Sequence, residues 1–89
     1  MTVIWTNKFK KEYAESIKRN LDISKLDEII RMLSNNIQLP EKYKDHPLSG
    51  QYKGYRECHI QPNWLLIYKI CDNKLILVLS RTGTHSDLF

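Results

Sequence analysis

The side chains best suited to proton transfer lie in the second half of the chain. His46, His59 and His85 are its three histidines. Arg81 lies four residues before His85, and Glu57 two residues before His59. Histidine titrates near ~6.5, so it can both accept and donate protons at neutral pH. These residue types indicate acid–base chemistry beside an arginine that binds an anion.

Cleavage of an RNA phosphodiester bond requires this combination. A base removes the proton of the 2′-hydroxyl, an acid protonates the leaving 5′-oxygen, and a guanidinium stabilises the charge on the phosphorane. No metal is required, because the nucleophile belongs to the substrate. A single histidine on a strand is usually a packed or surface residue, so the hypothesis depends on these side chains converging in the fold.

Motifs of other common sites are absent. The chain has no G-x-x-x-x-G-K-[ST], G-x-G-x-x-G, H-E-x-x-H or G-x-S-x-G, so nucleotide cofactors and serine-hydrolase chemistry have no support. The histidines match no metal-ligand spacing, and Cys58 and Cys71 form no C-x-x-C pair. We therefore expect no metal and no cofactor, and we expect both cysteines to be small buried or half-buried hydrophobes without a disulfide.

The elements that must position these residues begin with a strand and two helices. β-branched and aromatic residues predict a strand over 2–6, and the spacing Ser24-Lys-Leu-Asp27 suggests a capping box for the second helix. The tight turn after the first helix predicts an antiparallel hairpin. The two apolar stripes at helical spacing are Phe9, Tyr13, Ile17 and Leu21, then Leu26, Ile29, Ile30, Leu33 and Ile37.

The second half of the chain reads as a loop followed by strands. Proline and glycine punctuate a polar stretch over 39–53, which predicts a long loop carrying His46. Strands are predicted over 55–60, 64–70 and 75–79, and alternation in the first of them places Glu57 and His59 on one face. We expect Arg81 to close the last strand and residues 85–89 to form a short tail.

This order of elements, β-α-α-β-β-β, predicts an α+β fold in which the helical hairpin packs on one face of a mostly antiparallel sheet. With 89 residues, 42% hydrophobic, the chain should form a single domain over 1–89. No apolar run approaches the ~18–20 residues of a membrane span, and no signal peptide is visible. We expect a cytoplasmic protein without membrane association.

The chain is mildly basic, with 14 Lys and Arg against 10 Asp and Glu, a net charge of +4. Lys10, Lys11 and Lys18 fall on the outer side of the first predicted helix. They are either a solvated helix face or a surface that binds phosphates, which would strengthen at low salt. Charge alone leaves both readings open.

Four segments carry a resemblance to a known family. They are Lys44-Asp-His-Pro-Leu-Ser-Gly50, Tyr52-Lys-Gly-Tyr-Arg-Glu-Cys-His59, Pro62-Asn-Trp-Leu-Leu-Ile-Tyr68 and Arg81-Thr-Gly-Thr-His-Ser-Asp-Leu-Phe89. Together they closely resemble the YafQ branch of the RelE-like toxins, within the RelE/ParE superfamily. Those toxins are ribosome-dependent mRNA interferases of type II toxin–antitoxin systems. The order of elements matches the family as well, so the resemblance spans the chain.

The resemblance implies a role for each matching position. His46 and His59 correspond to active-site histidines, Arg81 to the arginine that stabilises the phosphate, and His85 to a second group for proton transfer. Phe89 matches the C-terminal aromatic that helps to seat the mRNA base. Which histidine is the base and which is the acid stays open.

At three further positions the match to the family is incomplete or has a second explanation. Glu57 stands where relatives often carry Asp, which keeps the carboxylate. Asn63 stands where relatives often place Asp, and because an amide cannot take a proton, His46 or His59 would have to serve as the base. Trp64 matches a family tryptophan but, lying in a strand, is equally suited to the core.

The resemblance also implies partners. We expect an acidic, DNA-binding antitoxin encoded next to this chain, contact with operator DNA only through that antitoxin, and action on mRNA in the ribosomal A site. Lys10, Lys11 and Lys18 would then contact ribosomal RNA, although the helical hairpin could also receive the antitoxin. The alternative is a non-catalytic member of the same fold that binds a protein target such as gyrase, but such a protein has no evident need for three histidines near an arginine.

Overall fold

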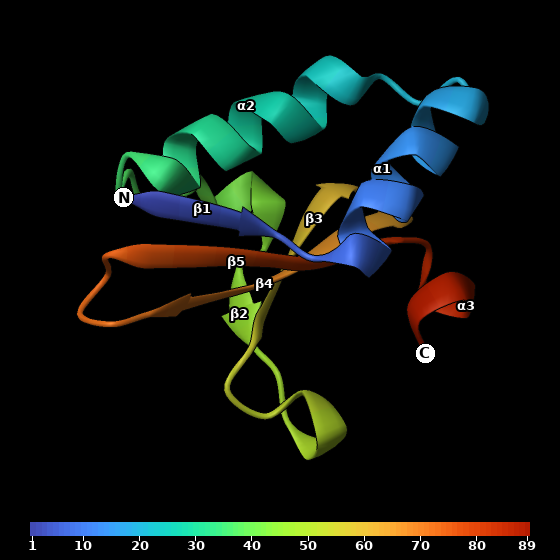
Figure 1. Cartoon of the computed structure of the whole chain (residues 1–89). Helices are drawn as coiled ribbons and strands as arrows, with labels where there is room; N and C mark the ends of the chain where they lie inside the picture. The colour runs from blue at the N-terminus through green and yellow to red at the C-terminus, as the bar shows by residue number, and fades with distance from the viewer.

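The computed structural model describes all residues 1–89, and Figure 1 shows two helices crossing one side of a sheet. The strands are β1 (Thr2–Trp5), β2 (His46–Pro47), β3 (Arg56–Gln61), β4 (Trp64–Cys71) and β5 (Ile76–Gly83). The helices are α1 (Asn7–Lys18), α2 (Ile23–Ser34) and α3 (His85–Leu88), with short 3₁₀ turns η1 (Glu41–Tyr43) and η2 (Gly50–Tyr52).

The sheet has five strands in the order β1-β5-β4-β3-β2. Only β1 and β5 run parallel, so the predicted α+β fold with a mostly antiparallel sheet is confirmed. The expected long loop was wrong in one respect, because His46 and Pro47 form a strand that pairs with β3. Two residues are too few for a hydrophobic period to show in the sequence.

Polar side chains cap the two long helices. The Thr6 hydroxyl accepts a hydrogen bond from the Phe9 N–H at 3.1 Å, which makes Thr6 the N-cap of α1. The capping box expected at Ser24 was wrong, since α2 starts two residues earlier than that cap requires. Asp22 is the N-cap, and its carboxylate accepts the Ser24 N–H at 3.2 Å.

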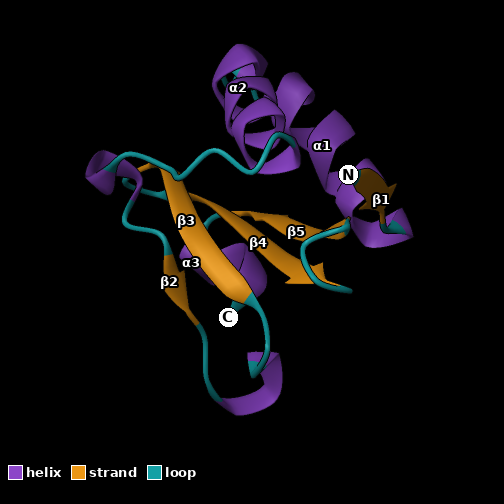
Figure 2. Ribbon diagram, turned by 90° about the vertical axis from the view of Figure 1, so that its left-hand side faces the viewer, coloured by secondary structure: helices purple, strands orange, loops and turns teal.

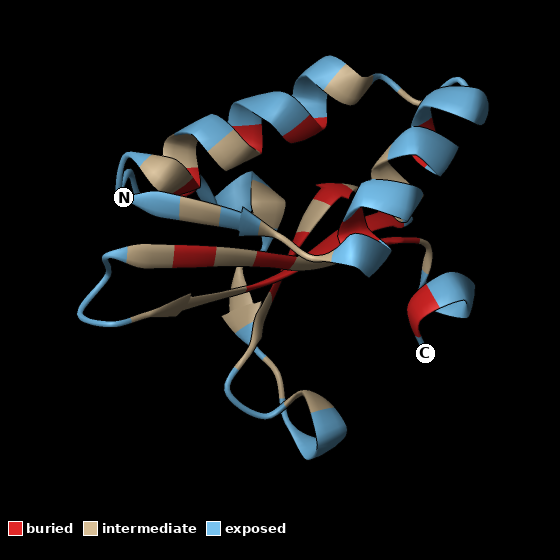
Figure 3. Cartoon of the chain, viewed as in Figure 1, coloured by how far each residue is buried: buried red, intermediate tan, exposed pale blue.

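The main core lies between the helical hairpin and what we call the hairpin face of the sheet (Figure 3). Leu26 and Ile29 of α2 and Phe9 of α1 are fully buried there against β3, β4 and β5. Its twelve buried members are Phe9, Leu26, Ile29, Leu33, Leu39, Cys58, Ile60, Trp64, Leu66, Tyr68, Leu77 and Leu79. Cys58 is thus a core residue, Cys71 is half-buried, and both thiols are free.

The apolar stripes are correct in α2 up to Leu33 but partly wrong elsewhere. Ile17 is 50% exposed and Ile37 is 43% exposed, whereas Ser16 is buried. Seven residues from Phe9 to Ser16 make nearly two complete turns at 3.6 residues per turn, while a step of eight rotates Ile17 away from the sheet. Residues spaced strictly by four therefore rotate progressively away from the side of the helix that packs on the sheet.

The opposite side of the sheet, which we call the site face, has a thin cover. Figure 2 shows α3 and η2 on this side, away from α1 and α2. Only Leu65, Ile67 and Leu88 form a buried cluster there, packed by Leu48, Tyr52 and Tyr55. The expected tail is a helical turn, α3, rather than an irregular end. None of the helices combines the length and apolar character that crossing a membrane would require.

Candidate active site

Glu57 lies between two histidines on the site face. Its Oε1 is 3.4 Å from Nε2 of His46 and 3.5 Å from Nε2 of His59. Strand alternation places Glu57 and His59 on the same side, as predicted, and the β2–β3 register sets His46 directly opposite Glu57. The Glu57 side chain is only 5% exposed, and a buried carboxylate is costly unless polar or charged groups lie beside it. The two imidazoles are those neighbours, and each can carry a positive charge when protonated.

Hydrogen bonds hold the segment that carries His46. Its Nδ1 lies 2.6 Å from the carbonyl oxygen of Lys44, which can only accept, so this nitrogen carries a proton. Asp45 accepts hydrogen bonds from the Tyr68 hydroxyl at 2.6 Å and from Arg56 Nε at 3.2 Å. Burial, and then the neighbouring Asp45, raise the pKa of Tyr68, so its hydroxyl remains a donor.

A row of rings extends from this cluster along the site face. The ring centroids of His46 and His59 are 6.2 Å apart, and those of His59 and His85 are 6.0 Å apart. Phe89 follows at 5.9 Å from His85, and Tyr52 at 5.6 Å from Phe89. The structure therefore brings all three predicted histidines and Phe89 together, and adds Tyr52.

Arg81 lies at the end of this row, and β5 continues two residues beyond it to Gly83. Its Nη1 donates to the Tyr52 hydroxyl at 3.4 Å, while Nε and Nη2 each donate to Glu12 of α1 at 2.8 Å. The Glu12 carboxylate raises the pKa of Arg81, which stays charged. Nothing in the sequence signals Glu12, because 69 residues separate it from Arg81.

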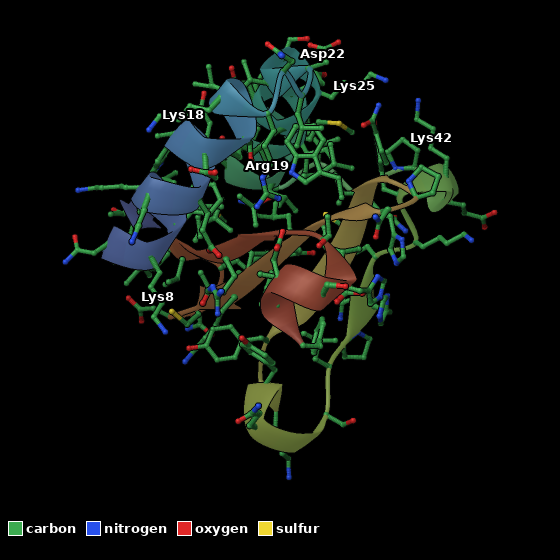
Figure 4. The ribbon with its side chains drawn as sticks, turned by 90° about the vertical axis from the view of Figure 1, so that its right-hand side faces the viewer. Lys8, Lys18, Arg19, Asp22, Lys25 and Lys42 are labelled. Carbon is green, nitrogen blue, oxygen red and sulfur yellow. The ribbon has the colours of Figure 1, made fainter.

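Helix α3 places His85 and Phe89, and an ion pair ties it to α1. Thr84 and Asp87 form a capping box, and Arg19 Nη1 lies 2.8 Å from Asp87 Oδ2. The hydrogen bond from Arg19, followed by one from the Thr84 N–H, lowers the pKa of Asp87 to about 2. Figure 4 shows Arg19 pointing towards α3.

Two other predicted positions lie away from this row. Asn63 is exposed in the turn between β3 and β4 and makes no hydrogen bond. Trp64 is only 2% exposed, and its indole N–H donates to the Thr82 hydroxyl at 3.1 Å. It therefore belongs to the core, which decides between the two readings of this tryptophan.

Two cavities flank the site. One, of about 400 Å³, lies between α1, β5 and α3 and is lined by four basic side chains. Its acidic residues, Glu12, Glu15 and Asp87, each form an ion pair with an arginine within 4 Å. The other, of about 560 Å³, adjoins His59. Its lysines, Lys25, Lys42 and Lys44, form no ion pair.

The lysines predicted to bind ribosomes are exposed on α1. Lys11 lines the first cavity, while Lys10 and Lys18 line neither. Figure 4 shows Lys18 pointing outward from α1 on the left, Lys25 beside Asp22 at the top, and Lys42 on the right.

The His46–Glu57–His59 cluster is also the one group that can hold a metal ion. One ligand atom from each residue lies within 4.8 Å of the others. Two imidazoles and a carboxylate suit Zn²⁺ or Cu²⁺. The sequence spacing argued against a metal because the ligands come from two strands, and only their pairing brings them together.

Known proteins resemble this chain over nearly its whole length. The family model described as "Bacterial toxin of type II toxin-antitoxin system, YafQ" matches residues 1–89. The mRNA interferase toxin YafQ of Escherichia coli K12 is 44% identical over 86 residues, covering 96% of this chain and 91% of that protein.

Solved structures show the same fold. E. coli YafQ in complex with DinJ superposes with a TM-score of 0.90 at 43% identity, covering 98% of this chain and 96% of that one. A copper-bound mutant toxin from Helicobacter pylori superposes with a TM-score of 0.92 at 35% identity, covering 100% and 99%. The chain thus belongs to the YafQ family of bacterial toxins of type II toxin–antitoxin systems.

Proposed function

We propose that this chain is an endoribonuclease that cleaves mRNA during translation and depends on the ribosome to do so. The observation that carries the proposal is the row of three histidine rings ending at Phe89, Tyr52 and Arg81 on a thinly covered face of the sheet. The E. coli relative at 44% identity is named an mRNA interferase.

The proposed reaction uses the substrate's own 2′-hydroxyl. A histidine takes its proton, the 2′-oxygen attacks phosphorus, and the bond from phosphorus to the 5′-oxygen breaks as a second group protonates the leaving oxygen. The products are a 2′,3′-cyclic phosphate and a 5′-hydroxyl. The proton acceptor and donor come from His46, His59 and His85, and Arg81 stabilises the charge on the phosphorane.

Two side chains would support this chemistry without exchanging protons with RNA. Glu57 is buried between His46 and His59, so its carboxylate would orient both rings. Phe89 is 63% exposed and offers its ring for stacking against an mRNA base.

Dependence on the ribosome follows from the size of the site. Positioning supplies ~7–11 kcal/mol of a barrier when reacting groups are held in place. Phe89 and Tyr52 are the rings at the arginine end of the row, too few to hold a flexible message unaided. We propose that the A site positions the message, that the exposed Lys10, Lys11 and Lys18 contact ribosomal RNA, and that the protein acts in the cytoplasm, where translation occurs.

A co-encoded antitoxin would silence this activity. The E. coli relative forms a complex with DinJ. A chain with a net charge of +4 should bind an acidic segment that folds on the toxin, and operator DNA would be contacted only through the antitoxin.

The test compares a naked transcript with the same transcript on programmed ribosomes. Cleavage should be fast on ribosomes and slow or absent without them, and charge reversal at Lys10, Lys11 and Lys18 should weaken ribosome binding in a salt-dependent way. Equally fast cutting of naked RNA would replace the proposal with a free ribonuclease. Trapping of gyrase on DNA without RNA cleavage would instead favour the non-catalytic alternative.

A further inference from the structure

Glu12 makes the most complete set of contacts to Arg81. Its two carboxylate oxygens accept hydrogen bonds from Arg81 Nε and Nη2, each at 2.8 Å. Oε1 also accepts the Thr82 N–H at 3.3 Å. The side chains of Glu12 and Arg81 are both only 20% exposed, so solvent competes weakly for this pair.

The fold gives Glu12 this place because β1 is short. Strand β1 pairs with β5 only from Ile76 to Leu79. Beyond Leu79 the edge of β5 has no strand neighbour, and α1 lies beside it instead. On that open edge, Glu12 accepts a hydrogen bond from the Thr82 N–H. The Thr82 hydroxyl donates to the Leu65 carbonyl at 2.7 Å, which ties this point of β5 to β4.

The contact leaves one edge of the guanidinium available. Glu12 binds the edge of the guanidinium formed by Nε and Nη2. The edge formed by Nη1 and Nη2 keeps N–H groups that Glu12 does not use. Nη1 reaches the Tyr52 hydroxyl, whose ring packs against Phe89 in the ring row. The available edge is therefore the one that faces the site.

We propose that Glu12 is the positioning residue of Arg81, holding its guanidinium so that the Nη1–Nη2 edge meets the phosphate in the transition state. This inference rests on the proposed function. A fixed donor needs no reorganisation as charge develops, which is the main source of electrostatic catalysis. The opposite role, a latch that withholds Arg81 from the phosphate, would give the opposite effect on rate.

Kinetics on programmed ribosomes separate the two roles. Glu12→Gln keeps the size of the side chain but can accept only through one oxygen. We expect it to lower the single-turnover cleavage rate about 10–100-fold with ribosome affinity unchanged, and Glu12→Asp to recover part of the loss. Glu15→Gln, one turn along α1 in the same cavity, is the control and should cleave as wild type does. A Glu12→Gln rate equal to or above wild type overturns the proposal.

A measurement without substrate keeps the inference separate from the proposed function. Exchange of the Arg81 Nε–H with water, followed by ¹⁵N NMR, should be slow in the wild type and in Glu15→Gln, and at least about 10-fold faster in Glu12→Gln, where one partner is lost. Thermal unfolding would confirm that the variant is folded. A fast-exchanging Nε–H in the wild type overturns the positioning role, whereas slow exchange in a protein that cleaves no RNA overturns the proposed function alone.

Discussion

The two faces of the sheet differ in what covers them. The hairpin face is closed by two twelve-residue helices over a cluster of twelve buried apolar residues. The site face has a four-residue helix and three buried apolar residues, and its remaining surface carries ionisable and aromatic side chains. The main core and the proposed active site therefore lie on opposite sides of the same strands, so that substitutions on each side should have separable effects.

The largest effect is expected on the site face. His85→Ala should lower mRNA cleavage ~10²–10⁴-fold, the usual cost of removing a group that transfers a proton. His85 is exposed and its side chain makes no hydrogen bond or ion pair, so the thermal midpoint should hardly change. Arg81→Ala should also abolish growth arrest on expression. Wild-type arrest and cleavage by both variants would remove them from the mechanism.

On the hairpin face we expect loss of stability without a change in chemistry. Leu26→Ala removes a fully buried side chain and should lower the free energy of unfolding by about 2–5 kcal/mol in urea titrations. Ile17→Ala, at a residue that is 50% exposed, is the matched control and should change it by less than ~0.5 kcal/mol. If Leu26→Ala proved as stable as the control, the division between the faces would be incorrect.

A smaller effect is expected where the two faces are joined, at the Arg19–Asp87 pair. Because the pKa of Asp87 is lowered to about 2, its contribution is complete above the ordinary carboxyl pKa of ~3.9 and is lost as the pH falls towards ~2. A third of this side chain is exposed, so we expect roughly 0.5–1 kcal/mol.

Thermal unfolding between pH ~4 and ~2 measures this contribution. The midpoint of the wild type should fall more steeply with acid than that of Asp87→Asn, and Ser86→Ala, in the same helical turn, should follow the wild type. Parallel curves for Asp87→Asn and the wild type would show that the pair adds nothing to stability.

The smallest effect is expected at Asn63, in the exposed turn between β3 and β4. Asn63 is exposed, its side chain makes no hydrogen bond, and it lies away from the row of rings, so Asn63→Asp should leave cleavage unchanged. Single-turnover rates on ribosomes are the measurement. A large loss would mean that the amide itself contacts RNA or ribosome where a negative charge is not tolerated.

Local patterns were sufficient for most of the elements. Alternation in β3 assigned Glu57 and His59 to one side, and the second apolar stripe located Leu26 and Ile29 in the core. Both inferences use a repeat contained within a few residues, which is why they were correct. Residue type and motif also singled out the three histidines and Phe89 as candidate site residues, and the fold brings their rings together.

What the sequence by itself determined about this protein was its set of elements, its family resemblance and the residue types of the site. The tertiary structure alone decided that His46 lies on a strand opposite Glu57, that Trp64 belongs to the core, and that Glu12 accepts hydrogen bonds from Arg81. The physical reason is that secondary structure depends on neighbours within one or two turns, whereas these contacts join segments up to 69 residues apart. The contacts between distant side chains depend on where β1 ends, on which strand pairs with β3 and on which face α1 turns towards the sheet. A repeat of apolar residues within one element carries no information about any of these.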